Sequence, residues 1–325
     1  MRLTIALALS LLTACGSSGG KREVRIPKGA GGLGFLPLLV MEKYRLIEKY
    51  ADVTVRWMDL GGPAAMNDAL LSSSADFISA GPPAFLTLWD KTRGSINVEG
   101  VAAMSSMPMY LNTNSPRLTR LDDISDQDKI AVTSIKVSIP AIIMQMYAQE
   151  KYGPAQATRF DKFTVSMAHP DAVVALLSGS AGISAHFSSP PFHQRERKDP
   201  RIRTITTSNE IMGGPSTFTM LYTRGKFHDE NPKVYAAFLK ALQEALAFIN
   251  DDKRGAAQTF LDMEGQGLKL EEVLEILNDP DVRYTTSPEN VMKYADFMAT
   301  VGSIKARPTK WQELFFSEIH GVPGS

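Results

Sequence analysis

The sequence is poor in residues that cross-link a chain or bind metals. Cys15 is its only cysteine, so neither an intramolecular disulfide nor a multi-cysteine metal site can form. The histidines lack the spacing of a metal cluster; they stand at positions 169, 186, 193, 228 and 320. We therefore predict no metal and no cofactor.

The sequence also lacks a net charge and the common catalytic motifs. Lys and Arg together number 35, as do Asp and Glu, so we expect no basic surface for nucleic acid. There is no G-x-S-x-G, no H-E-x-x-H and no phosphate-loop lysine motif. We predict that the protein is not an enzyme and does not bind nucleic acid.

Strongly apolar runs are confined to the N-terminus. Residues 1–14 combine a basic start with an apolar run too short to span a bilayer, which is typical of a secretory signal peptide. Its end, Leu-Thr-Ala before Cys15, resembles the bacterial lipobox, in which cleavage precedes a cysteine that becomes lipidated. Residues 15–22 would then be the lipidated cysteine and a flexible tether. We expect a periplasmic protein anchored to a membrane by lipid; an ordinary signal peptide with an incidental cysteine is the alternative.

Gly29, Gly31 and Gly34 have the spacing G-x-G-x-x-G, which is a weak signal by itself. Part of a dinucleotide-binding context is present, because the motif lies between two strand-like runs, and Asp59 ends the second. An exported protein would meet no pool of NAD, however. Glycine is also needed where the backbone turns with positive φ or approaches a ligand closely, so the motif has a second interpretation.

Strand-like and helix-like segments alternate along the chain, which predicts an α/β fold. Six helices are expected to begin at a Gly, Ser or His followed by Pro, directly after a strand, as at Gly62-Pro63 and Gly81-Pro82. In open parallel sheets such turns lie at the carboxyl edge, where ligands bind. Two facing edges would form a cleft lined by helix N-termini, suited to a small anion. The plain alternative is that Gly-Pro merely starts a helix.

Four segments resemble the periplasmic substrate-binding proteins of taurine, aliphatic-sulfonate and nitrate-type ABC importers. They are GFLPLLVMEKYRLIEKY, VTVRWMDLGGPAAMNDALLSSSADFISAGPPAFL, KIAVTSIKVSIPAIIMQMYAQEKYG and DAVVALLSGSAGISAHFSSPPF. The resemblance spans Val24 to the C-terminus. It implies an α/β, two-lobe periplasmic-binding-protein type II fold with two crossover strands and a ligand cleft between the lobes.

This resemblance also implies where the lobes divide. Lobe 1 would comprise residues 23–107 plus 215–325, and lobe 2 would comprise residues 108–214. The crossovers would lie near Met104–Leu111 and Thr217–Thr223, where the sequence is β-prone.

Candidate ligand-binding residues follow by position from the turns that face the cleft. They are Gly34, Phe35, Gly62, Pro63, Gly81, Pro82, Met107, Ser134, Ser138, His186, Phe187 and Gly214. Phe35 would cover an apolar part of the ligand, or else pack into the lobe core. The hydroxyls of Ser134 and Ser138 would cap a helix or reach the cleft. His186 would donate to an anion, or else be a buried histidine with its bonds satisfied.

The sequence departs from the family pattern where the ligand would be recognised. Relatives often carry a tryptophan and an acid where His186 and Phe187 stand, and an aspartate in place of Gly182. We expect a monomeric solute-binding lipoprotein that captures a small organic anion, sulfonate- or carboxylate-like with an apolar or aromatic body, and delivers it to an ABC permease. The alternatives are a neutral pyrimidine-like heterocycle, an apolar cargo, and an enzyme similar to those of thiamine-pyrimidine synthesis. Those enzymes are intracellular and cysteine-rich, which disfavours the last.

Overall fold

The computed structural model describes residues 21–325 apart from 30–31, 180–181 and 266. The predicted signal peptide (1–14), the lipidation site Cys15 and all but the last two residues of the predicted tether (15–22) lie outside this part, as does Gly31. Within the described part, no helix has both the length and the apolar character needed to cross a membrane.

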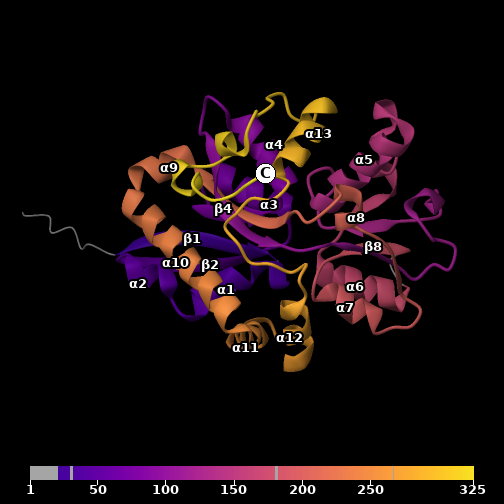
Figure 1. The fold of residues 1–325 in the computed structure, drawn as a ribbon, viewed down its shortest axis with the longest axis horizontal. Coiled ribbons are helices and arrows are strands. Elements are labelled where there is room, and N and C mark those ends of the chain that lie inside the picture. The colour runs from indigo at the N-terminus through magenta and orange to yellow at the C-terminus, as the bar shows by residue number, and fades with distance from the viewer. Residues whose placement is uncertain (1–20, 30–31, 180–181, 266) are drawn as a thin grey trace, which may run out of the picture.

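The strands of the described residues form three sheets, and the sheets divide the chain into two lobes (Figure 1). In the first lobe, a parallel pair lies beside a three-stranded sheet: β1 (Arg22–Gly29) with β2 (Val53–Leu60), and β3 (Phe77–Ala80), β10 (Thr217–Arg224) and β4 (Val98–Ser106) in that order. The second lobe has one five-stranded sheet, in the order β7 (Thr164–Ser166), β6 (Ile130–Val132), β8 (Ala185–Ser188), β5 (Tyr110–Thr113) and β9 (Arg203–Thr207).

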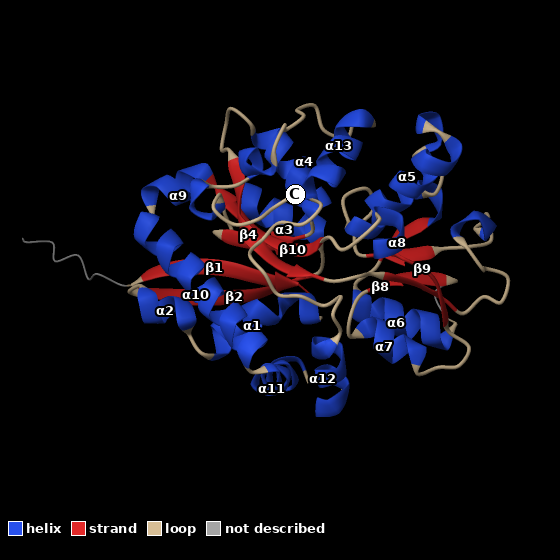
Figure 2. Ribbon diagram, viewed as in Figure 1, coloured by secondary structure: helices blue, strands red, loops and turns tan. Residues whose placement is uncertain are grey.

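Helices cover both lobes (Figure 2). Those that follow the strands of the first lobe are α1 (Leu36–Lys43), α2 (Leu46–Tyr50), α3 (Pro63–Leu71) and α4 (Pro82–Thr92). Those of the second lobe are α5 (Ile139–Tyr152), α6 (His169–Ser178), α7 (Phe192–Arg197) and α8 (Ser208–Met212). The C-terminal helices are α9 (Gly225–Glu230), α10 (Pro232–Asp251), α11 (Lys253–Glu264), α12 (Leu270–Asn278) and α13 (Val291–Thr300).

C-terminal helices α10, α11 and α13 pack against helices of the first lobe. Helix α10 packs against α1 and α2, so segments about 200 residues apart in sequence lie side by side (Figure 1). Phe238 of α10 stacks on Phe77 of β3 with ring centroids 3.9 Å apart, and both rings are fully buried. This contact joins the helical layer to the sheet.

The chain passes between the lobes twice. The first passage, 107–109, connects β4 to β5 and lies within the predicted crossover. The second is the segment 213–216 between α8 and β10. The segment Thr217–Thr223, predicted as the second crossover, is therefore strand β10 at the centre of the three-stranded sheet of the first lobe. We propose the divisions 107/108 and 214/215 as lobe boundaries on this change of sheet.

The predicted helix starts are present. Proline occupies the first or second position of α1, α3, α4, α5 and α6, where the N–H that it lacks would have no partner in the helix. Helix α7 differs slightly, because Pro191 is the residue just before its first turn. The sequence therefore places these turns correctly.

Candidate functional site

The turns of both lobes converge on one small pocket of about 70 Å³. The first lobe contributes Phe35 and the starts of α3 and α4, at Gly62, Pro63 and Gly81. The second lobe contributes the residue after β6, the first turn of α5, the start of α6 and the turn before α7: these are Thr133, Pro140, His169 and Ser189. The pocket thus lies where two rows of strand-to-helix turns face each other, as the sequence predicts.

Backbone amides at these helix starts have few partners. In α3, α4, α5 and α6, the side chain of the N-cap residue accepts no hydrogen bond from the amides of the first turn. The first turn of each helix therefore presents N–H groups and a partial positive charge toward the pocket end of the helix. Among the described residues that line the pocket, none is Lys, Arg, Asp or Glu. Recognition in this pocket must rely on neutral donors and on apolar contact.

Two glycines are required by close approach. A Cβ on Gly29 would lie 2.2 Å from the ring of Phe35, so this glycine lets the ring fold over the end of β1. A Cβ on Gly62 would lie 2.8 Å from the carbonyl oxygen of Thr133, which belongs to the other lobe. Gly29 therefore makes room for an aromatic ring in the pocket wall, and Gly62 allows the two lobes to meet.

Direct contacts hold the lobes together around the pocket. The amide of Leu33 donates to the carbonyl oxygen of Pro190 at 3.2 Å, and the amide of Ala64 donates to Oγ of Ser134 at 3.5 Å. Farther out, Lys198 at the end of α7 forms an ion pair with Glu272 of α12. The structure is thus a closed arrangement in which the lobes touch on both sides of the pocket.

Four of the predicted ligand-binding residues line this pocket: Phe35, Gly62, Pro63 and Gly81. The other eight lie outside its wall: Gly34, Pro82, Met107, Ser134, Ser138, His186, Phe187 and Gly214. Gly34 packs on Phe218 instead, and its carbonyl oxygen accepts from Thr219 Oγ1 at 2.8 Å. The hydroxyl of Ser138 donates to the carbonyl oxygen of Ser134 at 2.5 Å, so it neither caps the helix nor reaches the pocket.

His186 is fully buried behind the pocket wall. Neighbouring residues of its strand, β8, point to opposite faces of the sheet, yet both His186 and Phe187 are fully buried and neither lines the pocket. The histidine on the wall is His169, whose Nδ1 lies 2.8 Å from Nε2 of His186. Burial and the neighbouring His186 hold the pKa of His169 well below its usual value. His169 is therefore neutral at pH 7.

Sequence reasoning missed several lining residues. Met109 takes the place expected for Met107, and Phe218 faces the pocket together with Phe35. Ser79 also lines the pocket; it is buried, and its Oγ has no hydrogen-bond partner. The His169-Pro170 turn was correctly predicted as a helix start, and this position at the sheet edge is the signal that could have identified His169.

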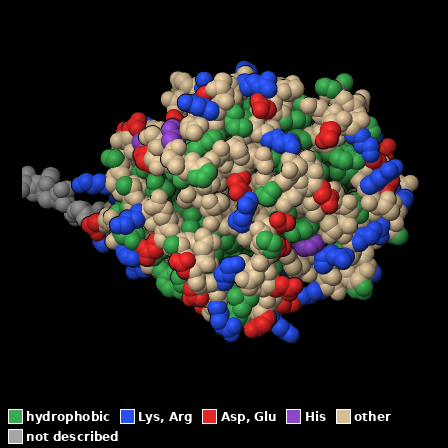
Figure 3. All heavy atoms as spheres, viewed as in Figure 1, with side chains coloured by type: hydrophobic (Ala, Val, Ile, Leu, Met, Phe, Trp, Pro, Cys, Tyr) green, Lys and Arg blue, Asp and Glu red, His purple; other side chains and the backbone are tan. Residues whose placement is uncertain are grey.

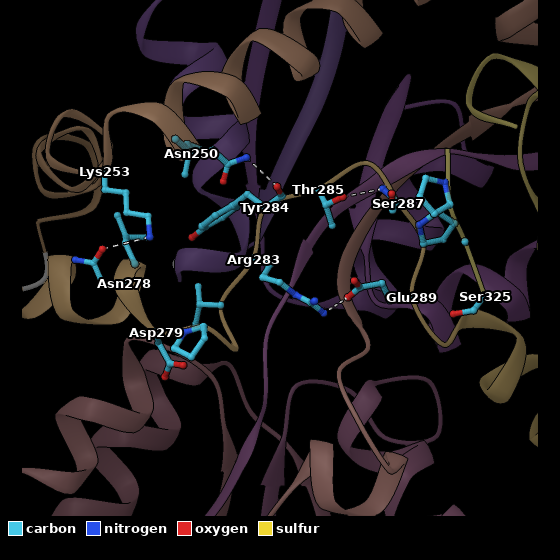
Figure 4. A pocket seen from close by; sticks show the side chains of 17 residues that line it. Asn250, Lys253, Asn278, Asp279, Arg283, Tyr284, Thr285, Ser287, Glu289 and Ser325 are labelled. Atoms are coloured by element: carbon cyan, nitrogen blue, oxygen red, sulfur yellow. Dashed lines mark hydrogen bonds and ion pairs between the residues drawn. The ribbon is translucent and has the colours of Figure 1, made fainter. Parts of the chain in front are cut away.

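A second, larger cavity of about 690 Å³ lies in the first lobe, between α10, α12 and the C-terminal segment (Figure 4). Its charged groups already have partners. Arg283 forms an ion pair with Glu289 at 2.6 Å, and Lys253 donates to Asn278 Oδ1 at 3.2 Å. It is lined only by residues 249–325 and lies away from the strand-to-helix turns, so we do not assign the ligand to it.

On the face seen in Figure 3, basic and acidic side chains are interspersed. No group of three or more His, Cys, Asp or Glu side chains within the described ranges is placed to hold a metal ion. The small pocket between the lobes is the candidate site.

Comparison with known proteins supports the fold. No protein-family model matches the chain, and no curated protein matches it. The alkanesulfonate-binding protein SsuA from Xanthomonas axonopodis pv. citri, bound to MOPS, matches with TM-score 0.68 and 14% identity over 88% of this chain and 95% of that one. The periplasmic nitrate-binding protein NrtA from Synechocystis PCC 6803 matches with TM-score 0.70 and 13% identity over 90% and 85% of the chains. A protein from Bordetella bronchiseptica RB50 matches with TM-score 0.73 and 19% identity over 92% and 95%.

These similarities extend over most of each chain at low sequence identity, so they establish architecture. The α/β alternation, the two lobes, the two passages between them and the pocket where they meet agree with this architecture. The predicted fold is confirmed: the chain has the two-lobe fold of the type II periplasmic binding proteins.

Proposed function

We propose that the protein is the solute-binding component of an ABC importer, and that it holds a small organic anion between its lobes. The observation that carries this proposal is the convergence of helix starts from both lobes on one small pocket. Helix N-termini bind anions through unpaired N–H groups and through the helix dipole. Sulfonates and carboxylates offer the oxygen acceptors that such donors need. In this role the chain captures and delivers its ligand and catalyses no reaction.

The apolar part of the wall favours an organic anion over a purely inorganic one. Phe35, Phe218, Met66, Met109 and Ile139 line the same pocket. Aromatic and methionine side chains bury an alkyl or aryl body, while amides and hydroxyls fix its polar end. The volume of about 70 Å³ limits the ligand in this closed state to a compact molecule. A cargo carrier for large apolar molecules would need a larger cavity.

Partner and location follow from the same proposal. A periplasmic protein anchored through Cys15 would present the closed complex to a membrane permease. The monomer is sufficient, because both walls of the pocket come from one chain. Closure would couple binding to delivery, since only a ligand that engages both lobes stabilises the closed state.

Calorimetry with a defined anion panel tests this function. The panel comprises methanesulfonate, taurine, acetate, benzoate and nitrate, with a neutral aminopyrimidine as the alternative class. We expect saturable binding of at least one organic anion and a loss of about tenfold or more in Phe35→Ala, because this substitution removes apolar contact. Tyr44→Ala, which changes an exposed aromatic of the same lobe, is the control. If only the aminopyrimidine binds, the ligand belongs to the class of neutral heterocycles and not to the organic anions. If no panel member binds, the proposal is contradicted.

A further inference from the structure

Three buried hydroxyl groups hold the carbonyl oxygens of the turn that precedes α1. The phenol of Tyr284 donates to the carbonyl oxygen of Leu33 at 2.8 Å. The carbonyl oxygen of Gly34 lies 2.8 Å from Oγ1 of Thr219 and 3.2 Å from Oγ of Ser105. These two hydroxyl oxygens are 2.5 Å apart, so whichever of them donates to the other, the second proton remains for Gly34. Side chains therefore fix two successive peptide groups of the turn.

The three donors lie next to the passages between the lobes. Ser105 is the next-to-last residue of β4, and Thr219 is the third residue of β10. Tyr284 belongs to the segment between α12 and α13. Its neighbour Arg283 exchanges two backbone hydrogen bonds, each of 2.8 Å, with Ser106 at the end of β4. The turn is therefore anchored to the part of the first lobe where both passages meet its sheet.

The anchored turn forms both a pocket wall and a contact between the lobes. The ring of Phe35 lines the pocket, and the amide of Leu33 donates to the carbonyl oxygen of Pro190 in the second lobe at 3.2 Å. The Gly34 carbonyl and the Phe35 amide belong to one planar peptide group, so the hydroxyl groups that hold this carbonyl also fix where the Phe35 side chain begins. The position of the aromatic wall thus depends on the three hydroxyl groups.

Loss of a hydroxyl partner should change the conformations that the turn adopts. A buried carbonyl group without a partner costs free energy, and the turn can avoid this cost by moving so that the carbonyl oxygen reaches water. Phe35 would then leave its place in the pocket wall. Because the ligand binds only the fraction of molecules that have the turn in place, the affinity falls by the same factor as this fraction.

We infer that Tyr284, Ser105 and Thr219 are positioning residues, which hold the turn so that Phe35 covers the ligand. Of the three, only Thr219 lines the pocket, and its hydroxyl group is already bonded to Gly34 and Ser105. Tyr284 and Ser105 act on the ligand through the turn alone. This inference rests on the proposed function and adds to it the residues that preorganise one wall of the site.

Hydrogen exchange, measured by NMR on the full chain without ligand, tests whether the hydroxyl groups hold the turn. The amide of Phe35 donates to the carbonyl oxygen of Gly32 at 3.2 Å, and the amide of Leu36 donates to that of Leu33. In Tyr284→Phe we expect these two amides to exchange about fivefold faster or more, because the turn opens locally. Amides in the middle of α5, in the other lobe, should keep their wild-type rates.

Three further variants show whether the hydroxyl group itself is responsible. Thr219→Val keeps the shape of the side chain and should also speed the exchange, though less than Tyr284→Phe, because Ser105 remains as a donor to the same carbonyl group. Thr219→Ser keeps the hydroxyl group and should exchange at the wild-type rates. Tyr50→Phe is the matched control, because its hydroxyl group donates to Glu244 between α2 and α10 and neither residue lines the pocket.

Calorimetry with methanesulfonate measures the effect on binding. We expect Tyr284→Phe to lower the affinity about fivefold or more and Tyr50→Phe to leave it unchanged. The loss should be at least about twofold smaller when Tyr284→Phe is combined with Phe35→Leu, because the aromatic ring that the turn positions is then absent. An equal loss in both backgrounds would show that Tyr284 does not act through Phe35.

The outcomes separate this inference from the proposed function. Wild-type exchange rates at Phe35 and Leu36 in Tyr284→Phe, or equally faster exchange in α5, overturn the inference even if anions bind. Full affinity for methanesulfonate in Tyr284→Phe overturns the role in binding. If the wild-type protein binds no panel anion, the proposed function fails, while hydrogen exchange still decides whether the hydroxyl groups hold the turn. If Tyr284→Phe does not fold, the comparison of Thr219→Val with Thr219→Ser decides.

Discussion

Gly62 lies where the lobes meet, and its replacement should weaken ligand binding without unfolding either lobe. A Cβ at this position would lie 2.8 Å from the carbonyl oxygen of Thr133 in the second lobe. Ordinary contact begins at 3.4 Å, so the lobes must separate by about 0.6 Å (3.4 − 2.8) at this point. The obstacle is backbone and cannot rotate away. Overpacking of this kind costs about 1–3 kcal/mol, which is about 5–150-fold in an equilibrium constant.

This cost falls on the closed state alone. The backbone at Gly62 is extended, with φ near 175°, so alanine introduces no local strain and the open protein should keep its stability. We expect Gly62→Ala to lower the affinity for methanesulfonate 5–150-fold with less than about 0.5 kcal/mol change in unfolding free energy. Gly321→Ala is the control, since a Cβ on this glycine also meets nothing within 4 Å and the residue does not line the pocket. Equal affinities for Gly62→Ala and wild type, or an equal loss in Gly321→Ala, would refute the reasoning.

Three further predictions concern stability and closure. Phe238→Ala should lower the unfolding free energy by about 3–5 kcal/mol in urea titrations, because it removes the ring stacked on Phe77, and a loss below 1 kcal/mol would contradict this. The unfolding free energy should also fall as pH drops from 6.5 toward 4. Burial and Arg197 lower the pKa of His193 to about 4, and burial and His186 hold the pKa of His169 well below its usual value, so the unfolded chain takes up protons first. His193→Gln should reduce that decrease by about 1 kcal/mol between pH 6.5 and 5, and an unchanged decrease would exclude His193 as a cause. Lys198→Gln breaks the half-exposed ion pair with Glu272 between the lobes and should lower the ligand affinity at most a few-fold. Because salt screens such a pair, the affinities of variant and wild type should be equal in 0.5 M salt. A difference that persists in salt would show that the lost charge pair is not its cause.

The sequence predicted the backbone frame of the site because that frame is local chemistry. A Gly-Pro pair after a β-rich run starts a helix at the edge of a sheet wherever it occurs, so Gly62, Pro63 and Gly81 reach the pocket as expected. Phe35 also lines the pocket, because Gly29 gives its ring space to fold back. These positions can be predicted once the end of the preceding strand is known.

The side chains on the second lobe could not be placed in this way. The sequence predicts a strand that contains His186 and Phe187, but it does not show that this strand, β8, lies between β6 and β5 with both side chains fully buried. That arrangement buries His186 behind His169 and pairs it with Glu196, which is ten residues away and lies within a charge run that suggests a solvated surface. Likewise, the choice between Met107 and Met109 depends on which side of a short passage faces the pocket. Such facts follow from the strand order, which the sequence pattern does not give.

The absence of a charged side chain from the pocket wall has a consequence for how closure responds to ligand. An arginine in the cleft would be hydrated when the lobes are open and would lose that hydration on closing, so an empty closed state would carry a large penalty. Neutral amides and the Ser79 hydroxyl cost less to bury than a charged side chain does. Only the ligand then brings an uncompensated charge into the pocket. Closure of the empty protein is therefore inexpensive, and selectivity depends on how completely the donors of both lobes replace the hydration of the oxyanion.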